Sequence, residues 1–548
     1  MTRSSTAHLI LTGGRIRTMD DARPEAEAVA ISGERIVAVG SAAEIERWRS
    51  ASTRVVDLRG RTVTPGFQDA HCHPVYAGID LIHCALHDVY GESGYLEAIA
   101  AFATAHPDDA WIVGSGWYMG VFEGGYPTRQ LLDRVTGERP AFFDNRDGHD
   151  AWVNSAALRL AGIDRDTPDP ADGRIRRDAS GDPTGALHEG AMGLVTKLLP
   201  DDTDADFERA LLVAQERMHG FGITAWQDAI VRPRTERIYR GAASRGDLTA
   251  RVVGAMWWDR DRGLEQIDEL VARRNLGPVG RYSPSSVKLM LDGIVENGSA
   301  RLIAPYLDEH GQPTDRSGHD FIEPSLLKTA VTRLDSLGFQ CHFHAIGDAA
   351  VRLGLDACEA ALRANGRTDS RHHISHIQVV HPDDVPRFGQ LGVVANAQPY
   401  WAANSDQVVK LNNPVLGPER TTWQYPFRSL LRTGARMAMG SDWAVSTPNP
   451  LAEMEVAIRR IGDYDREAEP FLPDEALTLD ESLDAFTRGS AYVNHLDETG
   501  VVAAGNLADL AVFDRDLHDP GLRFLGDARV VATIVGGELV FEDEALEA

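Results

Sequence analysis

Two histidines separated by one residue, His71 and His73, end an apolar segment of the chain. In an extended strand, residues i and i+2 project from the same face, so both imidazoles can reach one metal ion while Cys72 points away. Imidazole is a common ligand of zinc and other divalent first-row metals. The pair therefore predicts metal chemistry, although an isolated pair of this kind is more often hydrogen-bonded or solvent-facing.

Two later segments contain further histidines at strand-like positions. In FQCHFHAIGD, His342 and His344 share a face, and His344 is nearer the carboxyl end of the strand. In RHHISHIQ, alternation puts His372 and His376 on one face and His373 on the other, and His376 is nearer the carboxyl end. Because active sites of α/β barrels lie at the carboxyl ends of the strands, we expect His344 and His376 to be the ligands.

A carboxylate and an amine complete the candidate set. Asp442 follows the apolar segment ARMAMGS, where it could bind a metal or cap the next helix. Lys288 lies in the strand-like segment SSVKLML, and an ammonium group with a pKa of about 10.4 would be repelled by metal ions. Beside two metals, it is expected to act as a carbamate, formed with carbon dioxide, that bridges the ions. The alternative is a strand lysine paired with Asp292.

These residues need a scaffold that brings strand ends together, and the middle of the chain alternates helical and strand-like segments. Repeated parallel strands with right-handed crossovers indicate a (β/α)8 barrel or a doubly wound sheet. Glycine-rich dinucleotide and P-loop fingerprints are missing, which favours the α/β class with a (β/α)8 TIM barrel. The helices are expected at Asp206–His219, Leu264–Asn275, Ser325–Leu337 and Asp383–Leu391, and the strands in ITAWQDA, SSVKLML, FQCHFHA, HHISHIQV, GVVANAQ and ARMAMGS.

Both ends of the chain read as short strands joined by tight turns. Residues 1–65 and 495–548 are expected to form one small β-sandwich, because chain ends commonly lie close together. The barrel is expected over residues 66–494, with a long insertion at about 75–220 after its first strand. Such an insertion would lie on the active-site face of the barrel.

The insertion is rich in aromatic residues, and substrate-binding candidates come from it. We expect Trp117 and His149 to contact substrate, and Tyr118 is a neighbouring candidate. Aromatic side chains often line pockets, so an apolar or aromatic amide is the expected ligand. The same side chains could instead form a core of the insertion itself. Later aromatic pairs, Trp257-Trp258 and Tyr400-Trp401, follow barrel segments and support the same interpretation.

The composition of the chain limits the classes of molecule that it is expected to bind. The chain has 548 residues, a net charge of −27 and a pI near 5.1, so its field would repel nucleic acid and acidic lipid. Four cysteines in so long a chain argue against a disulfide framework. No 18-residue apolar run and no secretory signal is evident, so we expect a cytoplasmic protein without a membrane span. The sequence does not determine the oligomeric state, and a homodimer is one possible assembly.

The chain resembles the amidohydrolase superfamily, specifically the YtcJ-like branch that includes N-substituted formamide deformylases. The resemblance covers almost the whole chain, and the motifs together are far more specific than any one of them. They are VTPGFQDAHCH (63–73), DGHDAWVNSAAL (147–158), GDPTGALHEGA (181–191), VKLMLDG (287–293), HFHAIGDAAV (342–351), RHHISHIQVV (371–380), GSDWAVSTPNP (440–450) and GNLADLAVFDRD (505–516).

The resemblance implies a set of metal ligands. His71 and His73 would bind the first metal with Asp442 beside it, a carboxylated Lys288 would bridge, and the second metal would take the ligands His344 and His376. Two features depart from the family pattern: the extra histidine His342, and Trp226-Gln-Asp, where relatives often have His-Asp.

The expected reaction is hydrolysis of a C–N bond in a small-molecule amide or cyclic amide by metal-activated hydroxide, with zinc the expected ion. Asp442 would take the proton of the attacking water and return it to the leaving amine. The main alternative is a heterocycle deaminase with a single metal, although its relatives carry a glutamate soon after the strand-five histidine and would leave Lys288 idle. A catalytically silent barrel that acts as a binding scaffold is a further alternative.

Overall fold

A parallel sheet of eight strands forms the core of the larger of the two compact units of the chain. The computed structural model describes residues 6–87, 89–146 and 148–546. The strands follow one another in the sheet in chain order. They are β8 (Phe67–Cys72), β15 (Ile223–Val231), β16 (Arg251–Trp257), β17 (Tyr282–Met290), β18 (Gln340–Ala345), β19 (His373–His376), β20 (Val394–Ala397) and β21 (Met437–Met439).

The first and last strands approach one another and nearly close the sheet into a barrel. Just after β21, the amide of Asp442 donates to the carbonyl of His71 at 2.7 Å. The side-chain amide of Asn396 on β20 donates to the carbonyl of Ala70 on β8 at 2.9 Å. The predicted α/β fold with a TIM barrel is confirmed.

Helices connect successive barrel strands, as the alternating pattern predicts, and most of them have a buried apolar face and an exposed polar one. The four helices expected from the sequence are present within two residues of their predicted bounds. The connecting helices are α7 (Asp204–Gly220), α8 (Pro233–Arg245), α9 (Gln266–Arg274), α10 (Pro324–Ser336), α11 (Asp348–Asn365), α12 (Val385–Leu391), α13 (Asn413–Thr421) and α14 (Phe427–Arg432), and α15 (Pro450–Arg459), α16 (Leu479–Asp484) and α17 (Ser490–Val493) follow the last strand.

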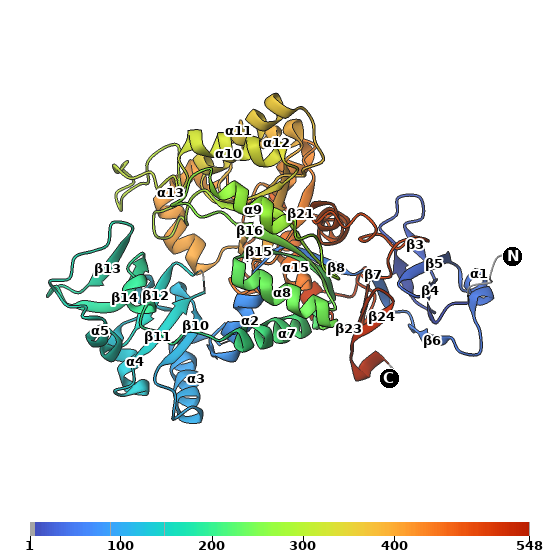
Figure 1. Ribbon diagram of the computed structural model, residues 1–548, viewed down its shortest axis with the longest axis horizontal. Coiled ribbons are helices and arrows are strands. Elements are labelled where there is room, and N and C mark those ends of the chain that lie inside the picture. The colour runs from blue at the N-terminus through green and yellow to red at the C-terminus, as the bar shows by residue number, and fades with distance from the viewer. Residues whose placement is uncertain (1–5, 88, 147, 547–548) are drawn as a thin grey trace. The chain divides into compact units, whose positions relative to one another are not determined.

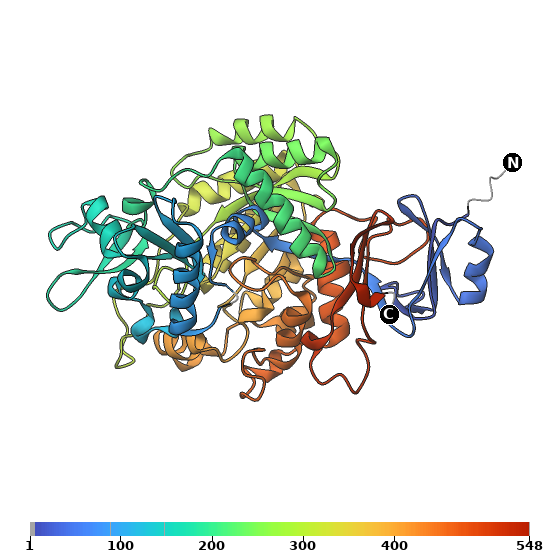
Figure 2. The same ribbon diagram turned by 90° about the horizontal axis from the view of Figure 1, so that it is seen from below.

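Strands from both ends of the chain share one sheet, which confirms the predicted β-sandwich. In this sheet β7 (Thr62–Pro65) pairs in parallel with β2 (Arg15–Arg17) and antiparallel with β22 (Leu510–Phe513), so that the blue and red ribbons lie side by side in Figures 1 and 2. Its other strands are β3 (Glu25–Ala26), β23 (Val530–Val535) and β24 (Glu538–Glu542), and the facing sheet has β1 (Leu9–Thr12), β4 (Ala28–Ser32), β5 (Arg35–Gly40) and β6 (Arg54–Asp57).

The segment after the first barrel strand builds a compact unit of its own, comprising Pro74–Ala214 and Trp443–Ser446. The remaining residues form the other unit, which includes both the barrel and the sandwich, so the predicted boundaries at residues 65 and 494 stay predictions. A six-stranded sheet runs through the smaller unit: β9 (Cys84–Ala85), β10 (Ile112–Trp117), β11 (Ala141–Asn145), β12 (Asp150–Val153), β13 (Gly173–Arg177) and β14 (Pro183–Glu189), with helices α2 (Pro74–Ile82), α3 (Gly91–Ala105), α4 (Arg129–Thr136) and α5 (Ser155–Ala161).

Within the described part of the chain, no helix has the combined length and apolar character that a bilayer crossing requires.

Candidate metal centre

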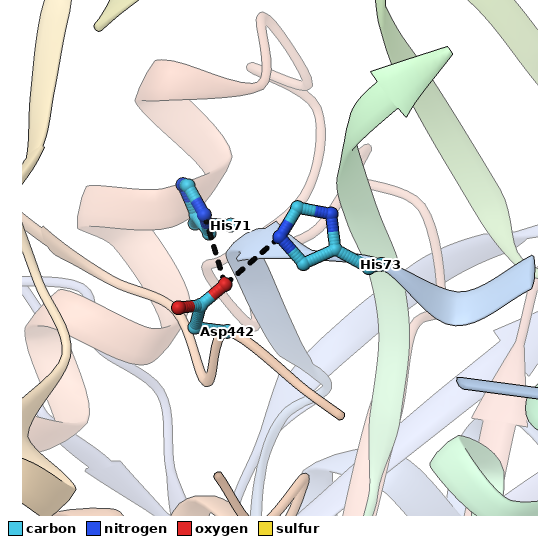
Figure 3. Close-up of side chains that lie close together, drawn as sticks. All are labelled: His71, His73 and Asp442. Atoms are coloured by element: carbon cyan, nitrogen blue, oxygen red, sulfur yellow. Dashed lines mark hydrogen bonds and ion pairs between the residues drawn. The ribbon is translucent and has the colours of Figure 1, made fainter. Parts of the chain in front are cut away.

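His71, His73 and Asp442 converge at the carboxyl ends of the first and last barrel strands (Figure 3). The Asp442 Oδ1 atom lies 3.1 Å from Nε2 of His71 and 2.9 Å from Nε2 of His73. One ligand atom from each residue lies within 4.8 Å of those of the other two. Two imidazoles and a carboxylate this close together form a donor set suited to zinc or another divalent first-row ion.

The electrostatics keep His71 and Asp442 in the protonation states that a metal ion requires. Burial and, to a smaller extent, the nearby Lys288 lower the pKa of His71 to about 3, so the imidazole is neutral near pH 7. Burial alone would raise the pKa of Asp442, but its contacts with His71 and His73 hold that pKa well below its usual value. A neutral imidazole and an ionised carboxylate are the forms that bind metals.

His376 and His344 extend the cluster to neighbouring strands. The His376 ring centroid lies 4.7 Å from that of His71 and 4.4 Å from that of His344. Nδ1 of His376 lies 3.9 Å from Asp442 Oδ2 and, although buried, has no hydrogen-bond partner among the described residues. Burial, reinforced by His344, lowers the pKa of His376 well below its usual value. The cluster therefore contains a buried neutral imidazole nitrogen that is free to bind a ligand.

The backbone of β19 explains why the alternation argument failed in the segment RHHISHIQ. His373 was expected to oppose His376, but its ring lies 4.0 Å from that of His342, among the same buried side chains as Ser375. His376 joins them because its φ of 77° is in the left-handed region, which breaks the two-residue repeat at the strand end. His372 instead contacts the Asp335 carboxylate at 3.1 Å.

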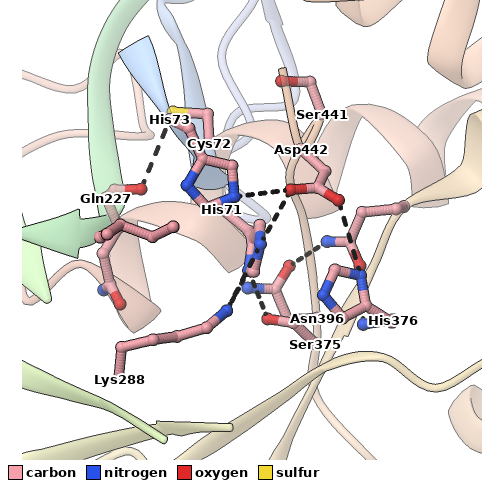
Figure 4. Close-up of polar contacts among 12 residues, drawn as sticks. His71, Cys72, His73, Gln227, Lys288, Ser375, His376, Asn396, Ser441 and Asp442 are labelled. Carbon is pink, nitrogen blue, oxygen red and sulfur yellow. Dashed lines mark hydrogen bonds and ion pairs between the residues drawn. The ribbon is translucent and has the colours of Figure 1, made fainter. Parts of the chain in front are cut away.

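Lys288 is buried beside His71, with its Nζ atom 3.5 Å from each of the two ring nitrogens (Figure 4). Burial lowers the pKa of Lys288 to about 7, so much of this amine is uncharged near neutral pH. The alternative pairing with Asp292 is wrong, because that carboxylate accepts backbone amides from Arg301, Ile346 and Gly347 at 2.8–3.0 Å.

A buried aspartate fixes the loop that carries Asp442. The carboxylate of Asp69 on β8 accepts hydrogen bonds from the amide of His71 at 3.0 Å and from the amide of Ser441 at 3.1 Å. The Ser441 hydroxyl also donates to Asp69 at 2.5 Å. These bonds join the two strand ends that supply the ligands, and Asp442 itself adopts a left-handed φ of 55°. The position of its carboxylate is therefore determined by the barrel closure.

A second set of polar side chains lies deeper inside the barrel, and its role was not predicted from the sequence. We call His71, His73, His376 and Asp442 the strand-end layer, and the set below it the amide layer: Gln227, Gln340, His342, His373 and Asn396. All of the amide layer is at most 2% exposed. Glutamine and asparagine inside otherwise apolar strands were the available signal, and the departure Trp226-Gln-Asp contains one of them.

The aromatic and histidine candidates of the insertion lie in the smaller unit. Trp117 is fully buried there, with its indole N–H donating to the carbonyl of Phe143 at 2.9 Å and its ring 5.9 Å from that of Phe122. His149 is partly exposed, and its Nδ1 lies 2.9 Å from a carboxylate oxygen of Glu189. Both contribute to the packing or hydrogen bonding of this unit, and contact with substrate stays a prediction.

Of the other predicted aromatic residues, Trp401 lies beside the strand-end layer. Its ring stacks on that of His376, with centroids 5.5 Å apart and planes 23° from parallel. Trp258 is buried, whereas the Trp257 ring contacts the guanidinium of Arg232 at 5.3 Å. An aromatic surface is thus present at the candidate centre, although Trp401 and not Trp117 provides it within the larger unit.

Known proteins resemble this chain over nearly its whole length. A relative that is 31% identical, Protein LONG AFTER FAR-RED 3 of Arabidopsis thaliana, aligns with 98% of the chain and 92% of its own length. The N-substituted formamide deformylase of Arthrobacter pascens is 29% identical over 97% of the chain and 98% of its own length. A solved structure, an uncharacterized metal-dependent hydrolase from Pyrococcus furiosus, covers 93% of the chain and 99% of its own with a TM-score of 0.71 and 25% identity.

The family model for amidohydrolases matches residues 54–541, which include the barrel, the insertion and part of the sandwich. The matched region contains every residue of the strand-end layer. The chain is therefore a member of the amidohydrolase family, a metal-dependent hydrolase built on a nearly closed parallel barrel.

Proposed function

We propose that this protein hydrolyses a C–N bond of a small-molecule amide or cyclic amide. The observation that carries the proposal is the convergence of His71, His73 and Asp442 at the strand ends, with the neutral His71 imidazole beside an ionised carboxylate. The similarity to a formamide deformylase over nearly the full length supports an amide as the substrate class.

The strand-end residues would hold one or two divalent ions, which we propose to be zinc. His71, His73 and Asp442 would bind the first ion, and His344 and His376 the second. The unpartnered Nδ1 of His376 supports this assignment, since a buried nitrogen without a hydrogen bond costs about 1–3 kcal/mol unless a ligand satisfies it. With two ions, Lys288 would bridge them as its carbamate, which requires a neutral amine to attack carbon dioxide; its lowered pKa supplies that amine.

A bound ion and the protein side chains would have different roles in the reaction. A bound divalent ion supplies Lewis-acid activation of the substrate carbonyl and of a water molecule. Asp442 would then accept the proton of the attacking water, because its ionised carboxylate is fixed at the strand ends. The same residue would deliver that proton to the leaving nitrogen, so that the amine departs neutral. Trp401 stacked on His376 provides an apolar surface for the rest of the substrate.

The overall charge supports a small molecule as the partner. A net charge of −27 disfavours nucleic acid, and we propose a cytoplasmic enzyme that acts on a neutral or aromatic amide. Assembly as a homodimer is a separate proposal that a size measurement of the purified protein would decide.

The test is a substrate screen on protein of known metal content. The purified chain, loaded with zinc or manganese, is incubated with N-formyl, N-acyl and cyclic amides, and the carboxylate and amine products are quantified. We expect metal-dependent release of both products from at least one class. Release of ammonia without a carboxylate would instead indicate a deaminase. A metal content below half an equivalent per chain, without rescue by added ion, would indicate a silent scaffold.

A further inference from the structure

The amide layer connects the candidate metal centre to backbone carbonyls deeper in the barrel, and each of its bonds has a defined direction. The chain of contacts begins at Gln340, whose Nε2 donates to the carbonyls of Arg371 at 2.9 Å and Val493 at 2.7 Å. Because carbonyl oxygens only accept, the orientation of the Gln340 amide is fixed. Its Oε1 must therefore be the atom that faces Gln227.

The orientation of Gln227 follows from that of Gln340. The Gln227 Nε2 atom donates to Gln340 Oε1 at 3.0 Å and lies 3.4 Å from Oδ1 of Asn494. Its Oε1 atom is left to accept from two histidines, Nδ1 of His342 at 2.7 Å and Nε2 of His373 at 3.1 Å. Each of these two nitrogens must carry a hydrogen to make the bond.

An independent set of contacts gives the same tautomer for His373. Asn396 Nδ2 donates to the carbonyl of Ala70 at 2.9 Å and lies 3.1 Å from Nδ1 of His373, while Asn396 Oδ1 accepts from Gln398 at 3.0 Å. Nδ1 of His373 is thus an acceptor, and its proton is on Nε2. This is the arrangement that the Gln227 orientation requires.

The direction of the bonds then determines the proton on His71. With its proton on Nδ1, His342 presents Nε2 as an acceptor, 2.7 Å from Nδ1 of His71. The Ser375 hydroxyl lies 2.9 Å from both nitrogens. If His71 and His342 are bonded directly, Nδ1 of His71 must be the donor, because Nε2 of His342 accepts. If Ser375 lies between them, its hydroxyl donates to His342 and accepts from Nδ1 of His71, which is again the donor. The lone pair of His71 Nε2 therefore faces Asp442 Oδ1, 3.1 Å away, and two acceptors at that distance are stabilised by a cation between them.

We propose that Gln227 is a positioning residue: through His342 it sets the tautomer of His71 that presents Nε2 to a metal ion. The inference rests on the proposed role of His71 as a ligand. Outer hydrogen-bond partners of metal-binding histidines fix the tautomer in this way. It also gives a role to His342 and to the Trp226-Gln-Asp segment, the two features that depart from the family pattern.

The variant Gln227→Met tests the donor-to-acceptor direction of this series of hydrogen bonds, because methionine has nearly the size of glutamine but lacks its amide. Without the acceptor, His342 can move its proton to Nε2 and donate to His71 Nδ1, which would place the proton of His71 on the metal-facing nitrogen. We expect zinc affinity, measured by competition with a chromogenic chelator, to fall about 10–100-fold. The metal-free protein, labelled with ¹⁵N at histidine, should show the His71 resonance change from an unprotonated to a protonated Nε2, with His71→Gln used for assignment.

Two further variants separate positioning from general destabilisation. In Gln227→Glu a protonated carboxyl retains both the donor toward Gln340 and the acceptor toward the histidines, so zinc affinity should stay near that of the wild type. Gln215→Met removes a buried amide of α7 whose partners among the described residues are backbone groups of Asp247, Thr249 and Ala250, and it should leave zinc affinity unchanged.

Failure of this inference can be distinguished from failure of the proposed function. If the wild type binds zinc and Gln227→Met binds it equally well, the positioning role is wrong. If the metal-free wild type carries its His71 proton on Nε2, the donor and acceptor directions assigned to the hydrogen bonds from Gln340 to His71 are wrong. If the wild type binds no zinc while the His71 tautomer is as assigned, the proposed metal function fails and the hydrogen-bond chain stands.

Discussion

The strand-end layer and the amide layer occupy the same barrel interior and have similar residue types, but their hydrogen bonding differs. In the strand-end layer, Nδ1 of His73 and Nδ1 of His376 are buried without a hydrogen-bond partner among the described residues. In the amide layer, by contrast, every described side-chain nitrogen and oxygen has a partner. Buried polar groups are normally satisfied, so atoms that lack a bond mark the place where a ligand is expected.

The comparison implies that the strand-end layer carries the chemistry, whereas the amide layer chiefly stabilises the fold and, through Gln227, orients His71. Substitutions in the strand-end layer should abolish chemistry and leave the metal-free fold stable. Substitutions in the amide layer should destabilise the fold first. Substitutions confined to one layer, and removal of the metal, therefore test this separation.

The largest effect is expected for Asp442→Asn in the strand-end layer. Asparagine cannot accept the proton of the attacking water, so turnover of the best amide substrate should fall about 10²–10⁴-fold while metal remains bound. Steady-state kinetics and metal analysis of the same preparation measure the two quantities. Asp335→Asn, a buried aspartate bonded to His372 and Ser370, is the matched control and should retain its rate per folded enzyme. Full activity of Asp442→Asn would contradict the role assigned to this carboxylate.

Removal of the metal should have the next largest effect, and it should separate activity from fold. Chelation is expected to eliminate turnover, but the satisfied amide layer should preserve the barrel, with unchanged far-ultraviolet circular dichroism. The free energy of unfolding should fall by about 2.7–4.1 kcal/mol relative to protein with zinc at 100–1,000 times its Kd. Thermal and denaturant unfolding measure this difference. Loss of secondary structure on chelation would show that the amide layer does not support the fold alone.

Substitution of Asn396 by leucine should be the most destabilising change within the metal-free protein. It leaves the carbonyl of Ala70, Nδ1 of His373 and the side chain of Gln398 without their partner, and unmade buried bonds cost about 1–3 kcal/mol each. We expect a loss of about 3 kcal/mol by denaturant unfolding. His376→Leu in the strand-end layer removes a nitrogen that has no bond, so it should cost less than 1 kcal/mol, by roughly the same principle. Equal losses of unfolding free energy in the two variants would show that the two layers do not differ in their contribution to stability.

The smallest effect concerns His219, a buried histidine of α7 outside both layers. Its Nδ1 contacts the carbonyl of Ile223 at 2.9 Å, and its Nε2 contacts the hydroxyl of Thr249 at 2.8 Å. Burial lowers the pKa of His219 to about 4. Between pH 6.5 and about 4 the unfolded chain binds a proton that the folded protein does not, so acidification removes stability.

Because of this difference at His219, the free energy of unfolding should be about 1.4 kcal/mol lower at pH 5.5 than at pH 7.5. His219→Gln cannot bind this proton, and its stability should therefore be less dependent on pH by that amount. Denaturant unfolding at the two pH values, for both proteins, gives the comparison. The same slope in the variant would show that other buried histidines account for the acid sensitivity.

Sequence reasoning identified the strand-end residues because their positions follow from simple rules. His71 and His73 follow the two-residue repeat at the end of β8, and Asp442 comes after β21 and the two residues Gly440 and Ser441. Parallel strands in chain order bring such ends to one edge of a sheet, so convergence in space was predictable. The (β/α) alternation and the pairing of both termini in one sandwich were predictable for the same reason, since they depend on local apolar periodicity.

What escaped prediction depends on backbone conformation and on contacts distant in sequence. The left-handed φ of His376 reversed the expected faces of β19 and brought His373 into the interior. The role of Gln227 depends on Gln340, 113 residues later, and no local pattern encodes that meeting. Burial of Trp117 depends on how the insertion packs on itself, which aromatic content alone does not reveal.

The sheet shared by the two termini has a consequence for synthesis on the ribosome. Strand β7 pairs with β22, which the ribosome makes only after roughly 450 further residues. At about 5–20 residues per second, one edge of β7 stays open for about 20–90 s while the rest of the polypeptide emerges. An unpaired strand edge exposes backbone N–H and C=O groups and is a template for aggregation, so the nascent chain should need protection during this interval. Shortening the carboxyl terminus before β22 would make that exposure permanent.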